Sequence, residues 1–187
     1  MGQDKALLPL GDKPLVAHVL EGAKDQCHAV AISSNNTSPE MRSFGVPVVP
    51  DMTEVTYFGP LAAILTGFQY IKKHHEDCVW LATLPTDTPY VPNNLIERAL
   101  DAARAESVNV VLASFDDDLQ QTMGLWHTSL YDALYHALVT DDLRKVKAFV
   151  REVGFAEIDF KLPTRKAAIN INTPEDLAMA SKIYREE

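Results

Sequence analysis

Residues 78–90 read CVWLATLPTDTPY, an apolar run that stops at a proline and is followed by an acid. The run 78–84 carries no charged residue, which is typical of a strand covered on both faces of a sheet. Pro85 ends the run, because a proline cannot donate a hydrogen bond to the sheet ladder. Ligands of open α/β sheets bind outside the carboxyl ends of the strands. The stretch therefore predicts a buried strand that brings Asp87 to a ligand site.

Apolar runs and helical patterns alternate on both sides of this stretch. The predicted helices are 14–24, 59–75, 93–105, 128–139, 143–153 and 173–184, and the predicted strands are 29–33, 46–50, 78–84, 108–114, 121–127, 156–160 and 167–171. This alternation predicts one α/β domain over residues 1–187, with a mostly parallel sheet and helices on both faces. The later part is less regular, and we expect it to add an antiparallel piece.

The composition is that of an ordinary globular protein. Of the 187 residues, 47% are hydrophobic and 23% are charged, and the net charge is -9. The absence of a basic stripe argues against a nucleic-acid partner. No apolar stretch reaches about 18 residues, so no membrane span is expected. The sequence also lacks a signal-peptide pattern, and Cys27 and Cys78 lie outside any CxxC motif. We therefore predict a cytoplasmic protein with reduced cysteines.

Polar side chains follow several of the predicted strands, and one lysine stands in the opening loop. They are Lys5, Ser33, Ser34, Asn35, Asn36, Asp51, Asp87, Asn170, Asn172 and Thr173. Because strand ends meet at one edge of such a sheet, we expect these groups to converge. One cation, two carboxylates and several amides suit a nucleotide and a divalent metal.

Each charged candidate has a simpler interpretation. Asp87 lies in a turn made rigid by prolines, where a carboxylate can hold Mg²⁺ against phosphate oxygens, or it only caps the turn. Lys5 contacts a ligand, or it is one solvated surface lysine. Asp51 accepts hydrogen bonds from a base, or it closes the turn before Met52.

The motifs together resemble one family, the molybdenum cofactor guanylyltransferases or MobA family. The opening MGQDKALLPLGDKPLVAHV (1–19) looks like the family signature, and VPVVPD, FGPLAAILTG, LPTDTPYVP, GLW and INTPEDL follow at fitting spacings. The resemblance extends over essentially the whole chain. It implies a Rossmann-like nucleotidyltransferase fold and an enzyme that transfers GMP from GTP to the terminal phosphate of molybdopterin. It also implies Mg²⁺ as the cofactor and pyrophosphate as the second product.

The resemblance assigns nucleotide-binding roles to five residues. Lys5 would contact the phosphates of GTP, and Asp87 would bind both Mg²⁺ and the nucleotide, so these two form the expected catalytic pair. Asp51 would help to hold the nucleotide. Ser33 stands where many members have an asparagine that faces the nucleotide, and Asn35 supplies an amide two residues later.

On the other side of the expected site, Asn170 and Asn172 match asparagines that line molybdopterin. The resemblance implies GTP and molybdopterin as substrates, with molybdenum-insertion proteins and molybdoenzyme chaperones as further partners. Two alternatives stay open. One is a cytidylyltransferase that acts on the same pterin, a group that tends to carry Gln-Pro-Lys where this chain has Gln-Asp-Lys. The other is an inactive remnant that binds the pterin or a partner.

The resemblance also sets an expectation for the first residues. Family members begin with an apolar strand and a Leu-Ala-Gly-Gly loop that ends in arginine, and Met1-Gly2 stands where that loop ends. We therefore expect residues 1–187 to lack this segment, and we interpret Met1 as an internal methionine taken for the start. Losing about five buried apolar side chains at ~2 kcal/mol each would remove roughly 10 kcal/mol. Because domains are stable by only about 5–15 kcal/mol, we expect a destabilised chain that binds GTP poorly.

Overall fold

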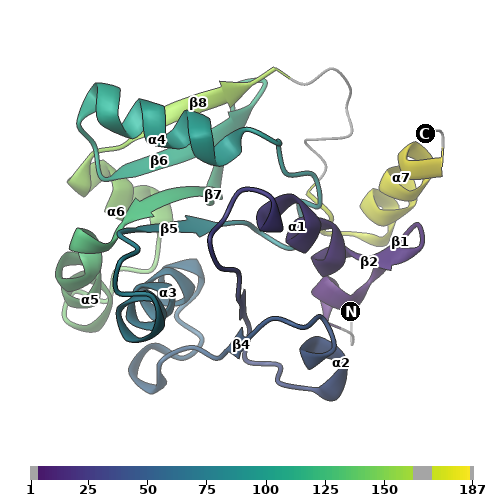
Figure 1. The fold of residues 1–187 in the computed structure, drawn as a ribbon, viewed down its shortest axis with the longest axis horizontal. Helices are drawn as coiled ribbons and strands as arrows, with labels where there is room; N and C mark the ends of the chain where they lie inside the picture. Colours follow the sequence, from purple (N-terminus) through teal and green to yellow (C-terminus); the bar gives the residue numbers. More distant parts are fainter. Residues whose placement is uncertain (1–3, 162–169, 186–187) are drawn as a thin grey trace.

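The computed structural model of this chain describes residues 4–161 and 170–185 (Figure 1). The helices in these residues are α1 (Leu15–Lys24), α2 (Pro39–Arg42), α3 (Pro60–His74), α4 (Leu95–Glu106), α5 (Tyr131–Val139), α6 (Val146–Val153) and α7 (Pro174–Arg185), with 3₁₀ helices η1 (Lys5–Leu7), η2 (Thr53–Val55) and η3 (Thr128–Leu130). None of these described helices is long and apolar enough to cross a bilayer.

The largest sheet has four strands in the order β5-β7-β6-β8. Its strands are β5 (Trp80–Thr83), β6 (Val110–Phe115), β7 (Asp118–His127) and β8 (Ala156–Phe160). Strands β6 and β8 are parallel, whereas β7 runs antiparallel to both β5 and β6. The strands β6 and β7 are joined by Asp116 and Asp117, whose φ angles of 50° and 70° suit a type I′ hairpin turn.

The antiparallel piece expected in the later part of the chain is β7, and it makes this sheet mixed rather than mostly parallel. A two-residue connection can join only antiparallel neighbours, because a parallel crossover needs a dozen or more residues. The tight turn between β6 and β7 thus reverses the chain and places β7 in the middle of the sheet. Parallel pairing is found in β6/β8 and in a separate pair, β3 (Ile32–Ser33) with β4 (Val48–Val49).

Helices cover both faces of the four-stranded sheet, as predicted. All six residues of β6 are buried, and its apolar side chains alternate between two hydrophobic clusters. Val110 and Leu112 pack with α3, α5 and α6, whereas Val111 and Ala113 pack with α4. Figure 1 shows α4 in front of the sheet and the paler α5 and α6 behind it. The alternation of β6 therefore builds both layers of the core from one strand.

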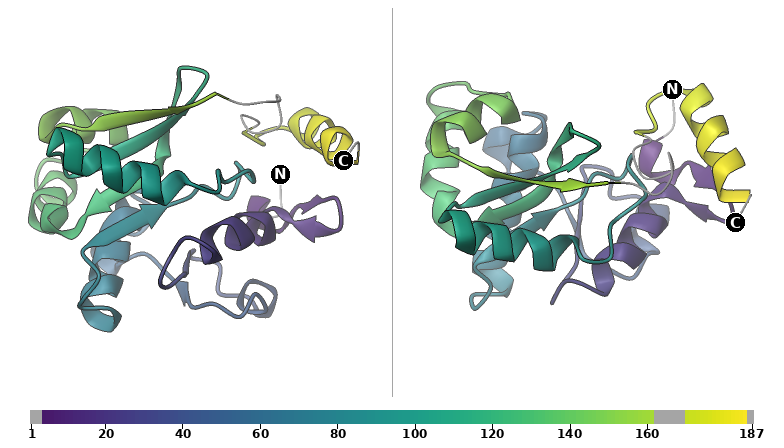
Figure 2. Two further views of the ribbon diagram at one scale, coloured as in Figure 1. Left: turned by 45° about the horizontal axis from the view of Figure 1, so that its top comes forward. Right: turned by 90° about the horizontal axis from the view of Figure 1, so that it is seen from above.

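The remaining elements form a second group around the ends of the chain. A hairpin of β1 (Pro9–Leu10) and β2 (Lys13–Pro14) precedes α1, and α7 packs beside it. Leu10, Leu15 and Ile171 are fully buried together in this cluster. The views in Figure 2 show α7 next to β1, β2 and α1 at one end of the molecule. The C-terminal helix thus brings residues that precede it to the first residues of the chain.

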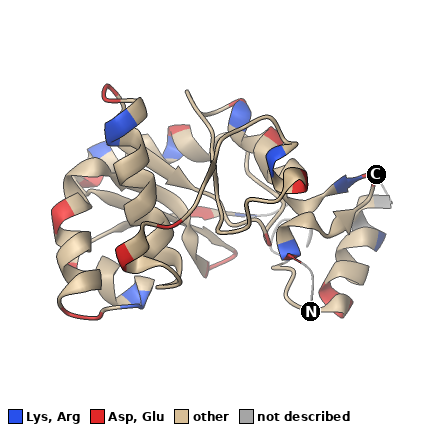
Figure 3. Ribbon diagram, turned by 90° about the horizontal axis from the view of Figure 1, so that it is seen from below, with Lys and Arg blue, Asp and Glu red and all other residues tan. Residues whose placement is uncertain are grey.

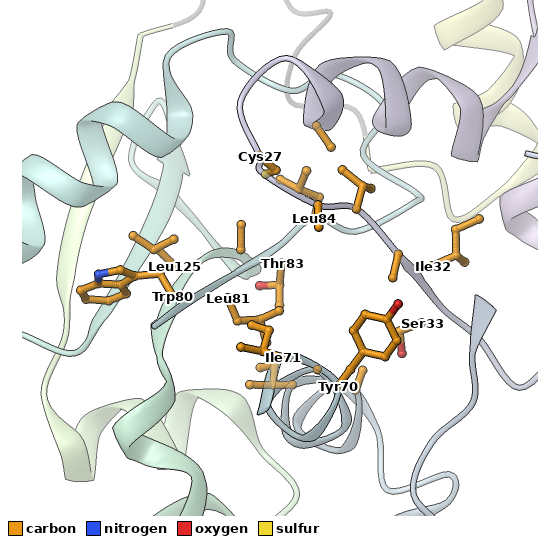
Figure 4. Close-up of a pocket in the computed structure, with 18 of the residues that line it drawn as sticks. Cys27, Ile32, Ser33, Tyr70, Ile71, Trp80, Leu81, Thr83, Leu84 and Leu125 are labelled. Carbon is orange, nitrogen blue, oxygen red and sulfur yellow. The ribbon is translucent and has the colours of Figure 1, made fainter. Parts of the chain in front are cut away.

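A cavity of about 830 Å³ lies between β3 and β5. Its walls are mostly apolar side chains; Figure 4 shows Ile32 and Ser33 on one side, Leu81 and Thr83 on the other, and Tyr70 of α3 beneath them. Within the described residues β3 pairs only with β4, and β5 pairs only with β7. The two sheets therefore stay separate across the cavity.

Most predicted elements coincide with observed ones to within a few residues. Short elements without a long apolar period were not predicted from the sequence: η1, η2, β1, β2 and α2. The predicted helix 128–139 is divided into η3 and α5. Of the predicted strand 167–171, residues 167–169 lie outside the described residues, and Asn170 and Ile171 are not part of a strand.

Gly124 on β7 is required by a close approach to β6. A Cβ atom at this position would lie 2.3 Å from the carbonyl oxygen of Val111, beside the register shift at Leu112. Gly124→Ala is therefore expected to lower the free energy of unfolding by about 1–3 kcal/mol, measured by urea unfolding. Gln121→Ala, exposed on the same strand, is the control and should change it by less than about 0.5 kcal/mol. Equal effects of the two changes would contradict this account.

Candidate functional site

Lys5 is fixed at both its backbone and its side chain. The Asp4 carboxylate caps η1 by accepting a hydrogen bond from the backbone N–H of Ala6 at 3.1 Å, and Ala6 is buried. The Lys5 Nζ atom donates to Oδ1 of Asn172 at 2.8 Å. Nδ2 of Asn172 in turn donates to Oδ1 of Asn170 at 3.0 Å. Lys5 and the two asparagines predicted on the pterin side thus form one hydrogen-bonded group.

Asp87 lies in the loop that follows β5, as the apolar run and its proline predict. Its carbonyl oxygen accepts a hydrogen bond of 2.8 Å from the backbone N–H of Ile171. Its side chain is half-buried, and this burial raises the pKa of the carboxyl, an effect that the nearby Lys5 ammonium partly offsets. Lys5 and Asp87 are therefore electrostatically coupled at the same end of the structure.

A second polar pair joins the loops after β3 and β4. Nδ2 of Asn35 donates to Oδ2 of Asp51 at 2.9 Å, and the backbone N–H of Asp51 donates to Oδ1 of Asn35 at the same distance. The backbone N–H of Tyr57 donates to the same carboxylate oxygen at 3.3 Å. The pair holds the two loop ends together and fixes the direction of the Asp51 carboxylate.

Asp4 connects the two groups, although it was not predicted from the sequence as a site residue. Its Oδ2 accepts a hydrogen bond of 2.9 Å from Nδ2 of Asn36, whose neighbour Asn35 holds Asp51. Its other oxygen caps the turn that carries Lys5. The one signal in the sequence is its place before Lys5, because aspartate is a favoured helix cap. A polar network thus runs from Asp51 through Asp4 to Asn172.

The structure brings most, but not all, of the predicted site residues into contact. Lys5, Asp87, Asn170 and Asn172 meet around residues 170–172, and Asn35 pairs with Asp51. Ser33 makes no side-chain hydrogen bond to these residues in the described part of the chain. It shares the wall of the 830 Å³ cavity with Asp87 and Asn170. The cavity is therefore lined by part of the group around Lys5, and Ser33 lies on the same wall.

The charges of the site suit a phosphate ligand with a metal ion. Lys and Arg are interspersed with Asp and Glu along the helices and loops (Figure 3), so positive charge for a triphosphate must come from a local residue such as Lys5. Among residues 4–161 and 170–185 no three His, Cys, Asp or Glu side chains form a metal cluster. The single carboxylate of Asp87 fits Mg²⁺, which takes one or two carboxylates and completes its shell with phosphate and water oxygens.

Comparisons with known proteins identify the family. A family model described as the MobA-like NTP transferase domain matches residues 1–155. A molybdenum cofactor guanylyltransferase of Mesorhizobium japonicum is 36% identical, across 98% of this chain and 89% of the relative. Another of that name, from Bradyrhizobium, is 32% identical across 100% of this chain and 87% of the relative. The chain therefore belongs to the MobA-like NTP transferases, and the resemblance seen in the sequence is confirmed.

Solved structures confirm the Rossmann-like nucleotidyltransferase fold. The molybdopterin-guanine dinucleotide biosynthesis protein A of Archaeoglobus fulgidus matches with a TM-score of 0.76 at 18% identity, over 100% of this chain and 93% of that one. A cytidylyltransferase for 2-C-methyl-D-erythritol 4-phosphate from Thermus thermophilus gives 0.70 at 17%, over 97% and 94%. A Mycobacterium tuberculosis protein in complex with manganese gives 0.68 at 14%, over 95% and 91%.

The raised pKa of Asp87 predicts a pH-dependent cost in stability. The unfolded chain loses this proton near pH 3.8, whereas the folded chain holds it to higher pH because burial opposes ionisation. Between these two values the folded state binds more protons, so the free energy of unfolding falls as the pH rises. Asp87→Asn removes the buried charge and should raise the Tm at pH 7, with the gain shrinking as the pH falls toward 4.

The control for the change in net charge is Asp132→Asn, at an exposed position of α5. Thermal unfolding of the three proteins between pH 4 and pH 8 measures the effect. A lower Tm for Asp87→Asn at pH 7 would mean that Asp87 serves the turn and not a ligand.

Proposed function

We propose that this protein transfers GMP from GTP to the terminal phosphate of molybdopterin and releases pyrophosphate. The observation that carries the proposal is the meeting of Lys5 and Asp87 at residues 170–172 in a member of this family. The proposal places the reaction in the cytoplasm and includes molybdenum-insertion proteins and molybdoenzyme chaperones as partners that exchange the pterin.

The chemistry needs positioning and charge neutralisation rather than a protein nucleophile. A phosphate oxygen of molybdopterin attacks the α-phosphorus of GTP, and a new P–O bond forms. The bond between the α-phosphorus and the bridging oxygen breaks, and its electron pair leaves with pyrophosphate. The Lys5 ammonium would meet the phosphate oxygens of GTP, and Asp87 would hold Mg²⁺. When bound, Mg²⁺ supplies further positive charge to the triphosphate.

The Asn35–Asp51 pair supports guanine as the base. Guanine presents two adjacent donors, N1–H and the N2 amino group. Oδ2 of Asp51 already accepts from Asn35 and Tyr57, so its Oδ1, with two lone pairs, is the atom that would accept them. Cytosine presents only its N4 amino group on the corresponding edge. The Asn35 amide fixes the Asp51 carboxylate through Oδ2, so its direction is set before the base arrives. Ser33 would lie beside the same nucleotide, and Asn170 would face the pterin side.

The test is pyrophosphate release by the purified protein with GTP, molybdenum-loaded molybdopterin and Mg²⁺. We expect pyrophosphate and the guanine dinucleotide of the pterin, identified by mass spectrometry, at GTP concentrations high enough to offset the weak GTP binding expected of residues 1–187. Lys5→Met and Asp87→Asn should each lower kcat by about 10²–10³-fold, because each removes a group that stabilises the transition state. The exposed Asp132→Asn variant should keep the full rate.

Two results would overturn the proposal in different ways. Pyrophosphate formed from CTP but not from GTP would indicate a cytidylyltransferase. Binding of molybdopterin without pyrophosphate from either nucleotide would indicate a protein that only holds or delivers the pterin.

A further inference from the structure

Residues 170–173 bind both proposed catalytic residues at once. The backbone N–H of Ile171 donates to the carbonyl oxygen of Asp87 at 2.8 Å. One residue later, Oδ1 of Asn172 accepts a hydrogen bond from Lys5 Nζ, also at 2.8 Å and across 167 positions of sequence. The segment thus sets where Lys5 lies relative to Asp87.

The segment is held in place by the buried side chain of Ile171 and by hydrogen bonds to Asp176. The Ile171 side chain is fully buried with Leu10 and Leu15. Oδ2 of Asp176 accepts the backbone N–H of Asn172 at 3.0 Å and that of Thr173 at 2.8 Å, and Thr173 Oγ1 accepts the N–H of Asp176 in return, which makes a capping box at the start of α7. These bonds hold the pKa of the Asp176 carboxyl below its usual value, so it stays ionised at neutral pH. The position of Asn172 is therefore fixed by the fold before any ligand binds.

We infer that Asn172 is a positioning residue for Lys5, an inference that rests on the proposed function. A lysine ammonium carries three donors, and the bond to Asn172 engages one of them. Two remain for phosphate oxygens. Because an amide oxygen is neutral, it orients the ammonium without cancelling the charge that the phosphates need. Because Nδ2 of Asn172 donates to Asn170, the oxygen of the amide and not its nitrogen points toward Lys5.

This role differs from the one that the family resemblance assigns. There Asn172 contacts molybdopterin, whereas its hydrogen bond here is to the lysine proposed for GTP. The two roles predict different kinetics. A residue that acts through Lys5 changes the KM for GTP and has no effect once Lys5 is gone. A pterin contact changes the KM for molybdopterin whether or not Lys5 is present.

A double-mutant cycle separates the two roles. The proteins are wild type, Lys5→Met, Asn172→Ala and the double variant, with kcat and both KM values measured for each. Asn172→Ala should raise the KM for GTP about tenfold, the loss typical of a hydrogen bond to a charged group, and leave the KM for molybdopterin unchanged. The double variant should be no worse than Lys5→Met. Asn94→Ala, an exposed asparagine at the start of α4, is the matched control.

A second Asn172 variant tests the importance of a neutral partner. Asn172→Asp keeps an acceptor for Lys5 but adds a negative charge beside the phosphates. It should therefore also raise the KM for GTP. Because Lys5 keeps a hydrogen-bond partner in this variant, chemical methylation of Lys5 by an added reagent should stay as slow as in wild type.

That methylation readout does not need activity. Reductive methylation of Lys5, followed by mass spectrometry of the apoprotein, should be several-fold faster in Asn172→Ala than in wild type or Asn94→Ala. Three results would each overturn the inference. The first is a double variant whose loss of kcat/KM equals the product of the losses of the two single variants. The others are a change in the KM for molybdopterin alone, and equal methylation rates in Asn172→Ala and wild type. If wild type transfers no GMP, the proposed function fails, and the methylation rates still decide whether Asn172 holds Lys5.

Discussion

The hydrogen bond from Ile171 to the carbonyl of Asp87 is the contact on which the site depends. It lies at the point where the end of β5 meets the chain that returns from the far end of the sequence. The buried side chain of Ile171 fixes that chain against β1 and α1. Its two neighbours, Asn170 and Asn172, are thereby left exposed, and one of them reaches Lys5. If residues 170–172 moved by one position relative to Asp87, Asn170 or Asn172 would take the buried place of Ile171.

Lys5 and Asp4 are hydrogen-bonded to neutral asparagine amides, which leave the charges of these two residues unneutralised. Lys5 bonds to an asparagine rather than to a carboxylate, and Asp4 bonds to Asn36 rather than to a cation. Direct ion pairs would neutralise the groups that a triphosphate and a metal ion require. The half-buried Asp87 lowers the stability of the folded state at neutral pH, because burial makes its charged form unfavourable. Proteins commonly give up some stability at such positions in exchange for function.

The sequence predicts those features that local patterns encode. The apolar run that ends at Pro85 correctly places Asp87 after a strand, and the capping residues of α7 mark where that helix begins. The pairing of β7 depends on the turn at Asp116–Asp117, and a strand pattern does not reveal which neighbour a strand takes. The Lys5–Asn172 bond joins residues that no local period connects. Asp4 was missed because η1 is too short to show a helical period.

A crystal structure of the protein with a non-hydrolysable GTP analogue and Mg²⁺ would show directly whether Lys5 and Asp87 form the nucleotide site. We expect the triphosphate beside Lys5 and Asp87, with Lys5 Nζ still bonded to Asn172 and the guanine against Asp51. A nucleotide bound away from Lys5 and Asp87, or a Lys5 side chain turned away from the phosphates, would contradict this expectation.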